Sequence, residues 1–138
     1  MNILLEIITP EGITYTDHVD EAIVPTSTGE IAILPNHVSL VTKVTHGELI
    51  IKKNSKTYSI MITEGFLQVT KNHISLLANY AQKAENISIA KAEEAKKRAE
   101  RLIKEKTSDK DFIIAEGELR KAMLELKIAF KHKKRIPV

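Results

Sequence analysis

The spacing of apolar residues changes near residue 81, and this change limits the possible folds more than any other feature of the chain. Up to that point, short β-branched runs are separated by Gly, Pro, Asn, Asp or Ser, which is typical of strands and turns. Beyond it, no proline occurs between Ile87 and Pro137, and apolar residues recur every three or four positions. We therefore expect two structural units, a β-rich unit over residues 1–84 and a helical unit over residues 85–138.

The first unit is expected to contain many short strands. Two pairs have the pattern of hairpins, over residues 48–62 with a turn at Asn54-Ser55 and over residues 66–77 with a turn at Lys71-Asn72. Many short strands with regular turns are typical of a sandwich or a flattened barrel. The fold class expected is α+β, with an N-terminal antiparallel β-sandwich followed by a C-terminal antiparallel two-helix hairpin.

The second unit is expected to contain two amphipathic helices. Ser88 or Asn86 can cap the first, and Ser108 with Asp111 resembles a capping box at the start of the second. Each helix carries one apolar stripe: Ile89, Ala92, Ala95, Ala99, Leu102 and Ile103 in the first, and Phe112, Ala115, Leu119, Ala122, Met123, Leu126 and Phe130 in the second. The short break at Thr107-Ser108-Asp109 folds the two helices into an antiparallel hairpin.

This hairpin is expected to be weak. Its alanines bury little area, and Gly117 inside the second helix costs about 1 kcal/mol relative to alanine. A partner whose differential affinity is a few kcal/mol can therefore move it. The sequence is equally consistent with a hairpin that simply packs on the sandwich.

Composition excludes several classes of function. The 138-residue chain contains no cysteine and no tryptophan, and aromatic residues make up 4%. Disulfides, thiol nucleophiles and cysteine-bound metals are therefore excluded, and stacking platforms for bases are scarce. The N-terminus does not resemble a signal peptide, and no apolar run approaches the roughly 20 residues that span a bilayer. We expect a protein that is cytosolic or held at a membrane by other proteins.

Charge divides the chain at the same place as the apolar spacing. Residues 1–81 hold 5 Lys+Arg and 8 Asp+Glu, whereas residues 82–138 hold 16 and 10. A basic unit indicates an acidic partner, and three classes of partner are acidic: nucleic acid, anionic lipid and acidic protein surfaces. The run from Lys131 to Arg135 lacks interleaved aromatic residues, so a frayed, solvated tail explains it better than a nucleic-acid contact.

The sequence contains no recognisable catalytic or metal-binding motif. It lacks the P-loop, Rossmann, HExxH and GxSxG patterns, and no two of its 5 histidines are spaced four apart. Glu30 and His37 are the sharpest acid–base candidates, but no nucleophile or oxyanion pattern accompanies them. The residues indicate an interaction protein, with no catalytic residue, metal or cofactor. Two alternatives stay open: a free-standing adaptor whose basic hairpin binds nucleic acid or an acidic protein, and a small enzyme that uses His37.

The order of several short motifs is distinctive. Thr9-Pro10-Glu11-Gly12 comes first, Gly29 to His37 (GEIAILPNH) second and Glu64 to Val69 (EGFLQV) third, followed by Leu76-Leu77-Ala78 and the helical stretch from Ala90 to Glu100. This series resembles the epsilon subunit of bacterial F-type ATP synthases, the counterpart of the mitochondrial delta subunit.

The resemblance extends over about residues 2–130, with two departures from the usual family pattern. Ala32 and Asn36 stand where the family usually has glycine. Asparagine tolerates a left-handed turn nearly as well as glycine, so the fold expectation is unchanged.

The resemblance implies a non-catalytic subunit of the central stalk, or rotor, which couples ion translocation to ATP synthesis and inhibits ATP hydrolysis. Its sandwich would dock on the gamma subunit and on loops of the membrane c-ring, peripherally, on the cytoplasmic side of a bacterial cell membrane. No nucleic acid would be involved. The residues expected to make the c-ring and gamma contacts are Glu30, Ile31, Leu34, Pro35, Asn36 and His37.

In the family, the hairpin adopts two positions. Folded down on the sandwich it permits turnover, and extended along gamma it enters the catalytic alpha/beta head and blocks ATP hydrolysis. The residues expected to contact an acidic loop of the beta subunits are Arg98, Arg101, Lys104, Arg120, Lys121 and Lys127.

Some bacterial members of the family also bind ATP at the hairpin, through an Ile/Leu-Asp-x-x-Arg-Ala motif and arginines on the second helix. Here Ser88 and Lys91 replace the Asp and Arg of the motif, and Lys121 and Glu125 stand nearest to the later arginines. Lysine lacks the bidentate fork of arginine, and glutamate repels phosphate. We therefore expect weak ATP binding or none.

Overall fold

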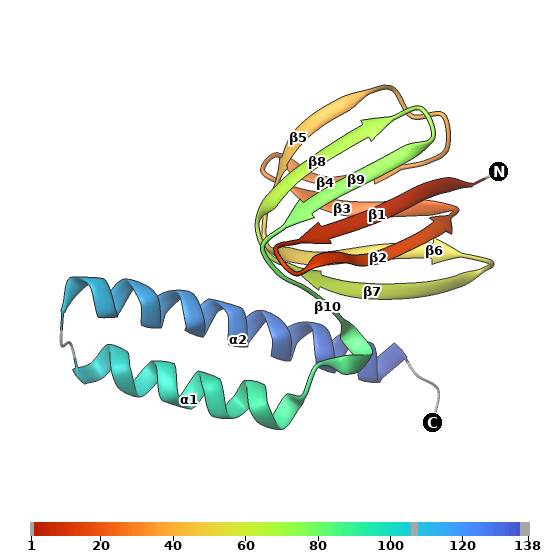
Figure 1. The fold of residues 1–138 in the computed structure, drawn as a ribbon. Helices are drawn as coiled ribbons and strands as arrows, with labels where there is room; N and C mark the ends of the chain where they lie inside the picture. Colours follow the sequence, from red (N-terminus) through yellow and green to blue (C-terminus); the bar gives the residue numbers. More distant parts are fainter. Residues whose placement is uncertain (1, 106–107, 136–138) are drawn as a thin grey trace. The chain divides into compact units, whose positions relative to one another are not determined.

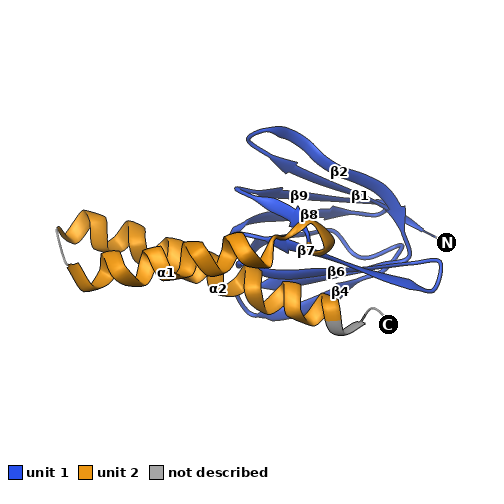
Figure 2. Ribbon diagram, turned by 90° about the horizontal axis from the view of Figure 1, so that it is seen from below, with its two compact units in different colours: residues 1–83 blue, residues 84–138 orange. Residues whose placement is uncertain are grey.

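The computed structural model describes residues 2–105 and 108–135. The chain forms two compact units, residues 1–83 and residues 84–138 (Figure 2). The first unit is built from strands and the second from helices, as the change in apolar spacing predicts.

The first unit contains ten strands within the described residues (Figure 1). They are β1 (Ile3–Thr9), β2 (Gly12–Val19), β3 (Glu21–Thr26), β4 (Gly29–Ile33), β5 (Leu40–Val44), β6 (Gly47–Lys53), β7 (Lys56–Ile62), β8 (Gly65–Thr70), β9 (His73–Ala78) and β10 (Ala81–Lys83). Both expected hairpins are present, as β6–β7 and β8–β9. Asn54 and Ser55 form the first turn with left-handed φ values of 52° and 65°.

One continuous ladder of hydrogen bonds joins the strands in the order β10-β7-β6-β3-β5-β8-β9-β1-β2, and β4 pairs with β3. The sheet bends between β3 and β5, which share one residue pair, Thr26 with Val44. The result is two facing layers, β10-β7-β6-β3-β4 and β5-β8-β9-β1-β2. The only parallel pairing in this ladder of described strands joins β1 to β9. The expected β-sandwich, a nearly closed flattened barrel, is confirmed.

The core of the sandwich lies between the two layers and is made of large aliphatic side chains. Alternate residues of several strands point inward, as in Ile3, Leu5 and Ile7 of β1. Other fully enclosed members are Ile33, Leu49, Ile51, Ile62, Leu67, Ile74 and Leu76. Each such side chain contributes about 1.5–3 kcal/mol through burial, so this unit has a substantial core of its own.

Gly65, at the start of β8, is required by the close approach of β9. A Cβ atom built at this position would lie 1.8 Å from the Leu77 carbonyl oxygen, a distance that no side chain can occupy. The glycine of the EGFLQV motif therefore has a packing role.

The second unit contains a short 3₁₀ helix, η1 (Ala84–Asn86), and two helices, α1 (Ile89–Glu105) and α2 (Asp109–Arg135). Ser88 caps α1, because its Oγ accepts the Lys91 N–H at 3.3 Å. Ser108 caps α2 in the same way, accepting the Asp111 N–H at 3.1 Å. The helix starts expected from the sequence are confirmed, whereas Thr107 of the expected break lies outside the described residues.

The C-terminal basic run differs from its expectation. Residues 131–135 continue α2 rather than forming a frayed tail. The run carries no proline before Pro137, so the helix has no reason to end earlier.

The contact between α1 and α2 is made mostly by alanines. Ala92 and Ala99 of α1 are buried, as are Ala115, Ala122 and Ala129 of α2. In each helix these alanines recur every seven residues, which keeps them on one side of the helix. We call these five residues the alanine seam.

The expectation of a single apolar stripe in each helix is only partly correct. Leu102, Phe112, Met123 and Phe130 belong to the expected stripes but are exposed. The reason is steric, because helices in contact through alanine approach closely and exclude longer side chains from the seam.

Candidate docking surfaces

The segment GEIAILPNH forms strand β4 and the loop that follows it. Residues Leu34 to His37 make a tight turn, in which the His37 N–H donates to the Leu34 carbonyl at 3.2 Å. Asn36 has a left-handed φ of 66°, so the asparagine serves where the family usually has glycine, as expected. The Asn36 N–H also donates to the Lys71 carbonyl at 3.2 Å, which ties the loop to the β8–β9 turn.

The six residues expected to make the ring and gamma contacts do not gather in one place. Glu30 lies near the start of β4, paired with Pro25, whereas Leu34 to His37 follow the end of the strand. His37 Nδ1 lies 2.7 Å from the Val38 carbonyl oxygen, so the ring is engaged with the backbone of the next residue. Glu30 and His37 therefore form no acid–base pair, and this segment presents an extended edge with exposed Leu34 and Val38 at its tip.

A second surface was not expected from the sequence. On the outer face of the layer β5-β8-β9-β1-β2, the strand register aligns Phe66 with Leu77, Leu77 with Ile8 and Ile8 with Ile13. Phe66 is 55% exposed and Ile13 is 65% exposed. We call these four side chains the Phe66 row. Four adjacent apolar side chains on the surface indicate an interaction site.

A cavity of about 780 Å³ lies beside the Phe66 row, within the sandwich unit. Its walls include Ile8, Phe66 and Leu77, and its polar lining includes Lys43 and His46. The signal for this surface was present in the sequence. In β8 the inward residues Leu67 and Val69 alternate with Phe66 and Gln68, so Phe66 is an apolar residue at an outward position.

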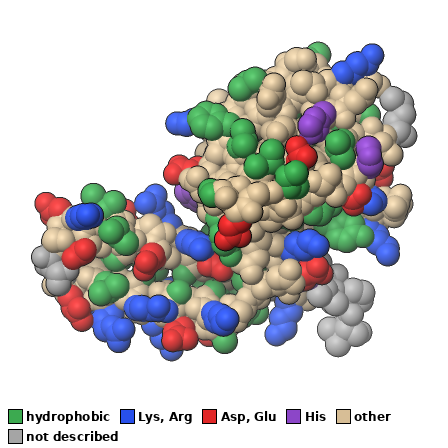
Figure 3. All heavy atoms as spheres, viewed as in Figure 1, with side chains coloured by type: hydrophobic (Ala, Val, Ile, Leu, Met, Phe, Trp, Pro, Cys, Tyr) green, Lys and Arg blue, Asp and Glu red, His purple; other side chains and the backbone are tan. Residues whose placement is uncertain are grey.

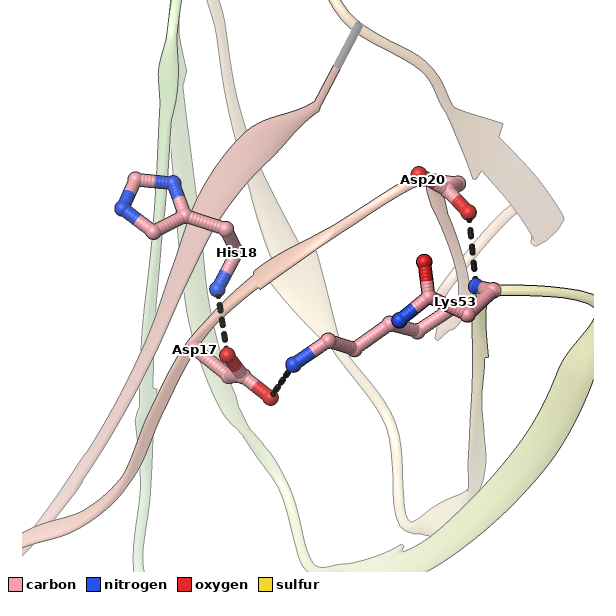
Figure 4. A network of polar contacts seen from close by, with 5 residues as sticks. Asp17, His18, Asp20 and Lys53 are labelled. Carbon is pink, nitrogen blue, oxygen red and sulfur yellow. Dashed lines mark hydrogen bonds and ion pairs between the residues drawn. The ribbon is translucent and has the colours of Figure 1, made fainter.

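Polar contacts join β2 to the β6–β7 hairpin at the open side of the barrel (Figure 4). Lys53 Nζ lies 2.6 Å from Asp17 Oδ2, and the Asn54 N–H donates to Asp20 Oδ2 at 2.9 Å. The hydrogen bond from Lys53 holds the pKa of Asp17 below its ordinary value. The second Asp17 oxygen accepts the His18 N–H at 2.8 Å. Sequence reasoning missed these residues because Asp17 and Lys53 are 36 positions apart.

The six basic residues expected on the hairpin are all exposed. Arg98, Arg101 and Lys104 follow one another at intervals of three on α1, and Arg120 and Lys127 are seven apart on α2, so each set shares one side of its helix. Acidic side chains are interleaved with basic ones over the hairpin surface (Figure 3). The arrangement is a mixed surface with basic rows rather than one basic patch.

The four positions matched to a nucleotide site differ in their use and exposure. The Ser88 hydroxyl is used as the cap of α1, and Lys91 is exposed. Burial raises the pKa of Glu125, and Lys121, one turn away, opposes that rise by lowering it. A half-buried carboxyl stands where the family places an arginine. Among the described residues, no group of three or more His, Asp or Glu side chains could hold a metal ion.

These features define a class of protein by its architecture, a β-sandwich with an exposed apolar row followed by a helical hairpin. The chain belongs to the ATP synthase delta/epsilon chain family: the beta-sandwich domain of that family matches residues 2–84, and its long alpha-helix domain matches residues 85–129. Within the part of the chain that the structure describes, no helix has the length and apolar character to cross a membrane.

Relatives named ATP synthase epsilon chain are similar over nearly the whole length. The protein from Caldanaerobacter subterraneus subsp. tengcongensis is 40% identical over 129 residues, which cover 93% of this chain and 94% of the relative. The protein from Dehalococcoides mccartyi strain BAV1 is 42% identical over 132 residues, covering 94% of each chain. These matches confirm the family resemblance and the interpretation of the chain as an epsilon-type subunit.

Two solved structures share the fold. A chain of the Euglena gracilis mitochondrial ATP synthase (OSCP/F1/c-ring) aligns with a TM-score of 0.75 at 19% identity, covering 97% of this chain and 82% of that one. A chain of the Tetrahymena thermophila mitochondrial ATP synthase (central stalk/c-ring) aligns with a TM-score of 0.60 at 13% identity, covering 94% and 97%.

Proposed function

We propose that the chain is a non-catalytic subunit of the rotor stalk of an ATP synthase, which couples ion translocation to ATP synthesis and restrains ATP hydrolysis. The observation that carries this proposal is the match of the family's two domains to the sandwich and the hairpin. The gamma subunit, the c-ring and the alpha/beta head would be its partners, with no nucleic acid. Its membrane association, on the cytoplasmic side of the bacterial membrane, would come through the complex alone.

The sandwich is the docking unit in this proposal. The edge formed by Glu30, Ile31 and the Leu34–His37 turn meets the loops of the c-ring, and the hydrogen bond from Asn36 to Lys71 holds that turn in place. The Phe66 row and the adjacent cavity meet gamma, because a stable stalk contact requires apolar area as well as polar edges. A large core gives this unit the stiffness that transmission of rotation demands.

The hairpin is the restraining unit. Because the alanine seam is small, separating or moving the two helices requires little free energy. A difference in docking energy of a few kcal/mol can therefore decide the position of the hairpin. In the head-bound position, Arg98, Arg101, Lys104, Arg120, Lys121 and Lys127 face an acidic loop of the beta subunits. No covalent chemistry is needed for this restraint.

Nucleotide control of the hairpin is weak or absent in this proposal. Lys91 and Lys121 offer point charges instead of arginine forks, and the Glu125 carboxyl opposes phosphate. We expect the dissociation constant for ATP to exceed about 10 μM, measured by isothermal titration calorimetry on the full chain. Tighter binding would contradict this part of the proposal.

The proposal is tested by ATP hydrolysis with a reconstituted alpha, beta and gamma head from the same source. The full chain is compared with a chain truncated after Asn86, which retains the whole sandwich core. We expect both to bind and only the full chain to inhibit. Binding of both without inhibition would remove the restraining role but keep the stalk role. Failure of both to bind would contradict the proposal as a whole.

A further inference from the structure

His73 carries an unsatisfied nitrogen atom at the start of β9. Its side chain is 43% exposed, yet the Nε2 atom is buried and has no hydrogen-bond partner among the described residues. It faces Glu6 of β1, whose Oε1 lies 3.7 Å away, within the range of an ion pair but too far for a hydrogen bond. A buried polar atom without a hydrogen bond is unfavourable, and native proteins contain few of them. This nitrogen therefore indicates a side chain with a second state that is better satisfied.

Protonation of the His73 ring supplies such a state. A neutral ring leaves Nε2 near the Glu6 carboxylate without a hydrogen bond, whereas a protonated ring is a donor at both nitrogens and carries the opposite charge to the carboxylate. The ion pair is therefore favourable only when His73 is protonated. Histidine ordinarily gains its proton between pH 5 and 8. The attraction is fully present below that range and is lost as pH rises through it.

Other charged groups around His73 do not replace Glu6. On β2, one strand beyond β1, the register places His18 in the same row as His73. On the other side, β8 contributes the uncharged Thr70, and Lys71 follows in the turn. Positive charge on His18 or Lys71 opposes protonation of His73, but both side chains are exposed, so water weakens that repulsion. Glu6, by contrast, is only 23% exposed.

Two backbone hydrogen bonds connect this contact to the turn that follows β4. The Leu4 N–H donates to the Asn72 carbonyl at 3.1 Å, so β1 holds the residue immediately before His73. The Asn36 N–H, in the turn after β4, donates to the Lys71 carbonyl at 3.2 Å. The β8–β9 turn is therefore held by β1 and itself holds the turn after β4. An ion pair that ties His73 to β1 stiffens both turns.

We propose that His73 and Glu6 form a proton-dependent clamp that tightens the β8–β9 turn, and with it the turn after β4, as pH falls. The clamp is a property of the sandwich alone. Its consequence for the complex rests on the proposed function, in which the turn after β4 meets the c-ring. A stalk subunit with this clamp presents a stiffer edge to the ring when its surroundings become more acidic.

Native-state amide exchange on the full chain tests the clamp directly. The reporters are the amides of Leu4 and Asn36, and the reference is the amide of Thr45, which donates to the Pro25 carbonyl at 3.1 Å. Exchange rates are corrected for their intrinsic pH dependence. We expect the protection of the reporters, relative to the reference, to fall about threefold between pH 5.5 and pH 7.5, as for the loss of one partly exposed ion pair.

His73→Gln and Glu6→Gln each remove one charge of the pair and keep a polar side chain. We expect either substitution to abolish the pH dependence of the reporters, and the double variant to show no further change. The matched control is His18→Gln, which removes an exposed histidine from the same row. A second control, His37→Gln, removes the histidine of the turn after β4. The Leu4 amide should keep its pH dependence in both controls.

The outcomes separate this inference from the proposed function. Equal pH dependence in His73→Gln and in the natural chain, or no pH dependence in the natural chain, overturns the clamp, as does its loss in His18→Gln. Far-ultraviolet circular dichroism establishes that each variant keeps the sandwich. Should one single variant fail to fold, the other decides, since removal of either charge removes the pair. These measurements use the chain by itself, so a failed clamp leaves the proposed function standing, and that function fails only in the reconstitution with the head.

Discussion

The sandwich and the hairpin bury apolar surface in opposite ways. In the sandwich, Ile, Leu and Val side chains alternate inward along several strands and are almost completely enclosed. In the hairpin, the buried side chains of α1 and α2 are alanines apart from Ile128, and several large apolar side chains of α2 stay exposed. The sandwich therefore draws its stability from its own core, whereas α2 keeps much of its apolar area available to a partner.

Under the proposed function, this difference lets one short chain combine a fixed part and a movable part. A unit that docks permanently and transmits rotation needs a core that resists deformation. A unit that changes position needs an internal contact weaker than, or comparable to, the contact it forms elsewhere. A substitution that makes a buried side chain of either unit larger or smaller should therefore change the stability of that unit in a predictable direction.

The largest expected effect is on the sandwich. Leu67 of β8 is fully buried, so Leu67→Ala should lower the free energy of unfolding of the sandwich by about 2–5 kcal/mol. Urea unfolding followed by far-ultraviolet circular dichroism and by amide exchange in β8 and β9 measures this change. Gln68→Ala, on the outer face of the same strand, is the control, and a similar loss there would contradict the assignment of the core.

The alanine seam should respond to the opposite change. Ala122 is 1% exposed between α1 and α2, and Ala122→Leu should push the helices apart and destabilise the hairpin by about 1–3 kcal/mol. Faster exchange of the α1 and α2 amides, with unchanged exchange in the sandwich, is the expected readout. Met123→Leu adds no bulk to the seam and should be nearly neutral. Equal tolerance of both substitutions would show that the seam is looser than its burial indicates.

The sequence was sufficient for the class of fold because its signals are local. Each signal acts within a few positions of the chain. Examples are the turn at Asn54-Ser55, the helix caps Ser88 and Ser108, and the absence of proline between residues 87 and 137. The left-handed Asn36 was also foreseeable, because asparagine is one of the few residues that accept that conformation. These features do not depend on the rest of the chain.

What the sequence did not show depends on contacts between distant segments. The Phe66 row exists because β8, β9, β1 and β2 lie side by side, and β1 reaches β9 from the other end of the unit. The Asp17–Lys53 pair depends on the approach of β2 to β6. The exposed flank of α2 depends on which part of its apolar side meets α1, and spacing alone does not choose between alanines and larger side chains.

A smaller effect is expected at Gly117, in the interior of α2. Apart from its chain neighbours and the backbone of its own helix, a Cβ atom added there would meet nothing within 4 Å, so alanine fits without rearrangement. Gly117→Ala should stabilise the hairpin by about 1 kcal/mol through helix propensity and a less flexible unfolded state. Thermal unfolding followed at 222 nm measures it, with Glu116→Ala as control. Destabilisation by Gly117→Ala would mean that a surface approaches the helix closely at that point.

The smallest effect concerns the pH dependence of the hairpin. Burial raises the pKa of Glu125 above its usual value of 4.5, and Lys121 opposes the rise by lowering it. The folded chain therefore holds the proton at pH values where the unfolded chain has lost it. Stability should fall as pH rises through this window, from the usual value up to the raised one. Glu125→Gln should remove this dependence and stabilise the hairpin at pH 7 by less than about 1 kcal/mol, since solvent still reaches the carboxyl.

Amide exchange of α2 between pH 4 and pH 8 tests this prediction against Glu118→Gln, which changes an exposed glutamate of the same helix. The free energy of opening in the natural chain, minus that in Glu125→Gln, should decrease as pH rises. An increase would mean that attraction to Lys121 outweighs burial. In that case the Lys121–Glu125 pair would hold α2 in place at neutral pH, and the hairpin would have a second source of stability besides its alanine seam.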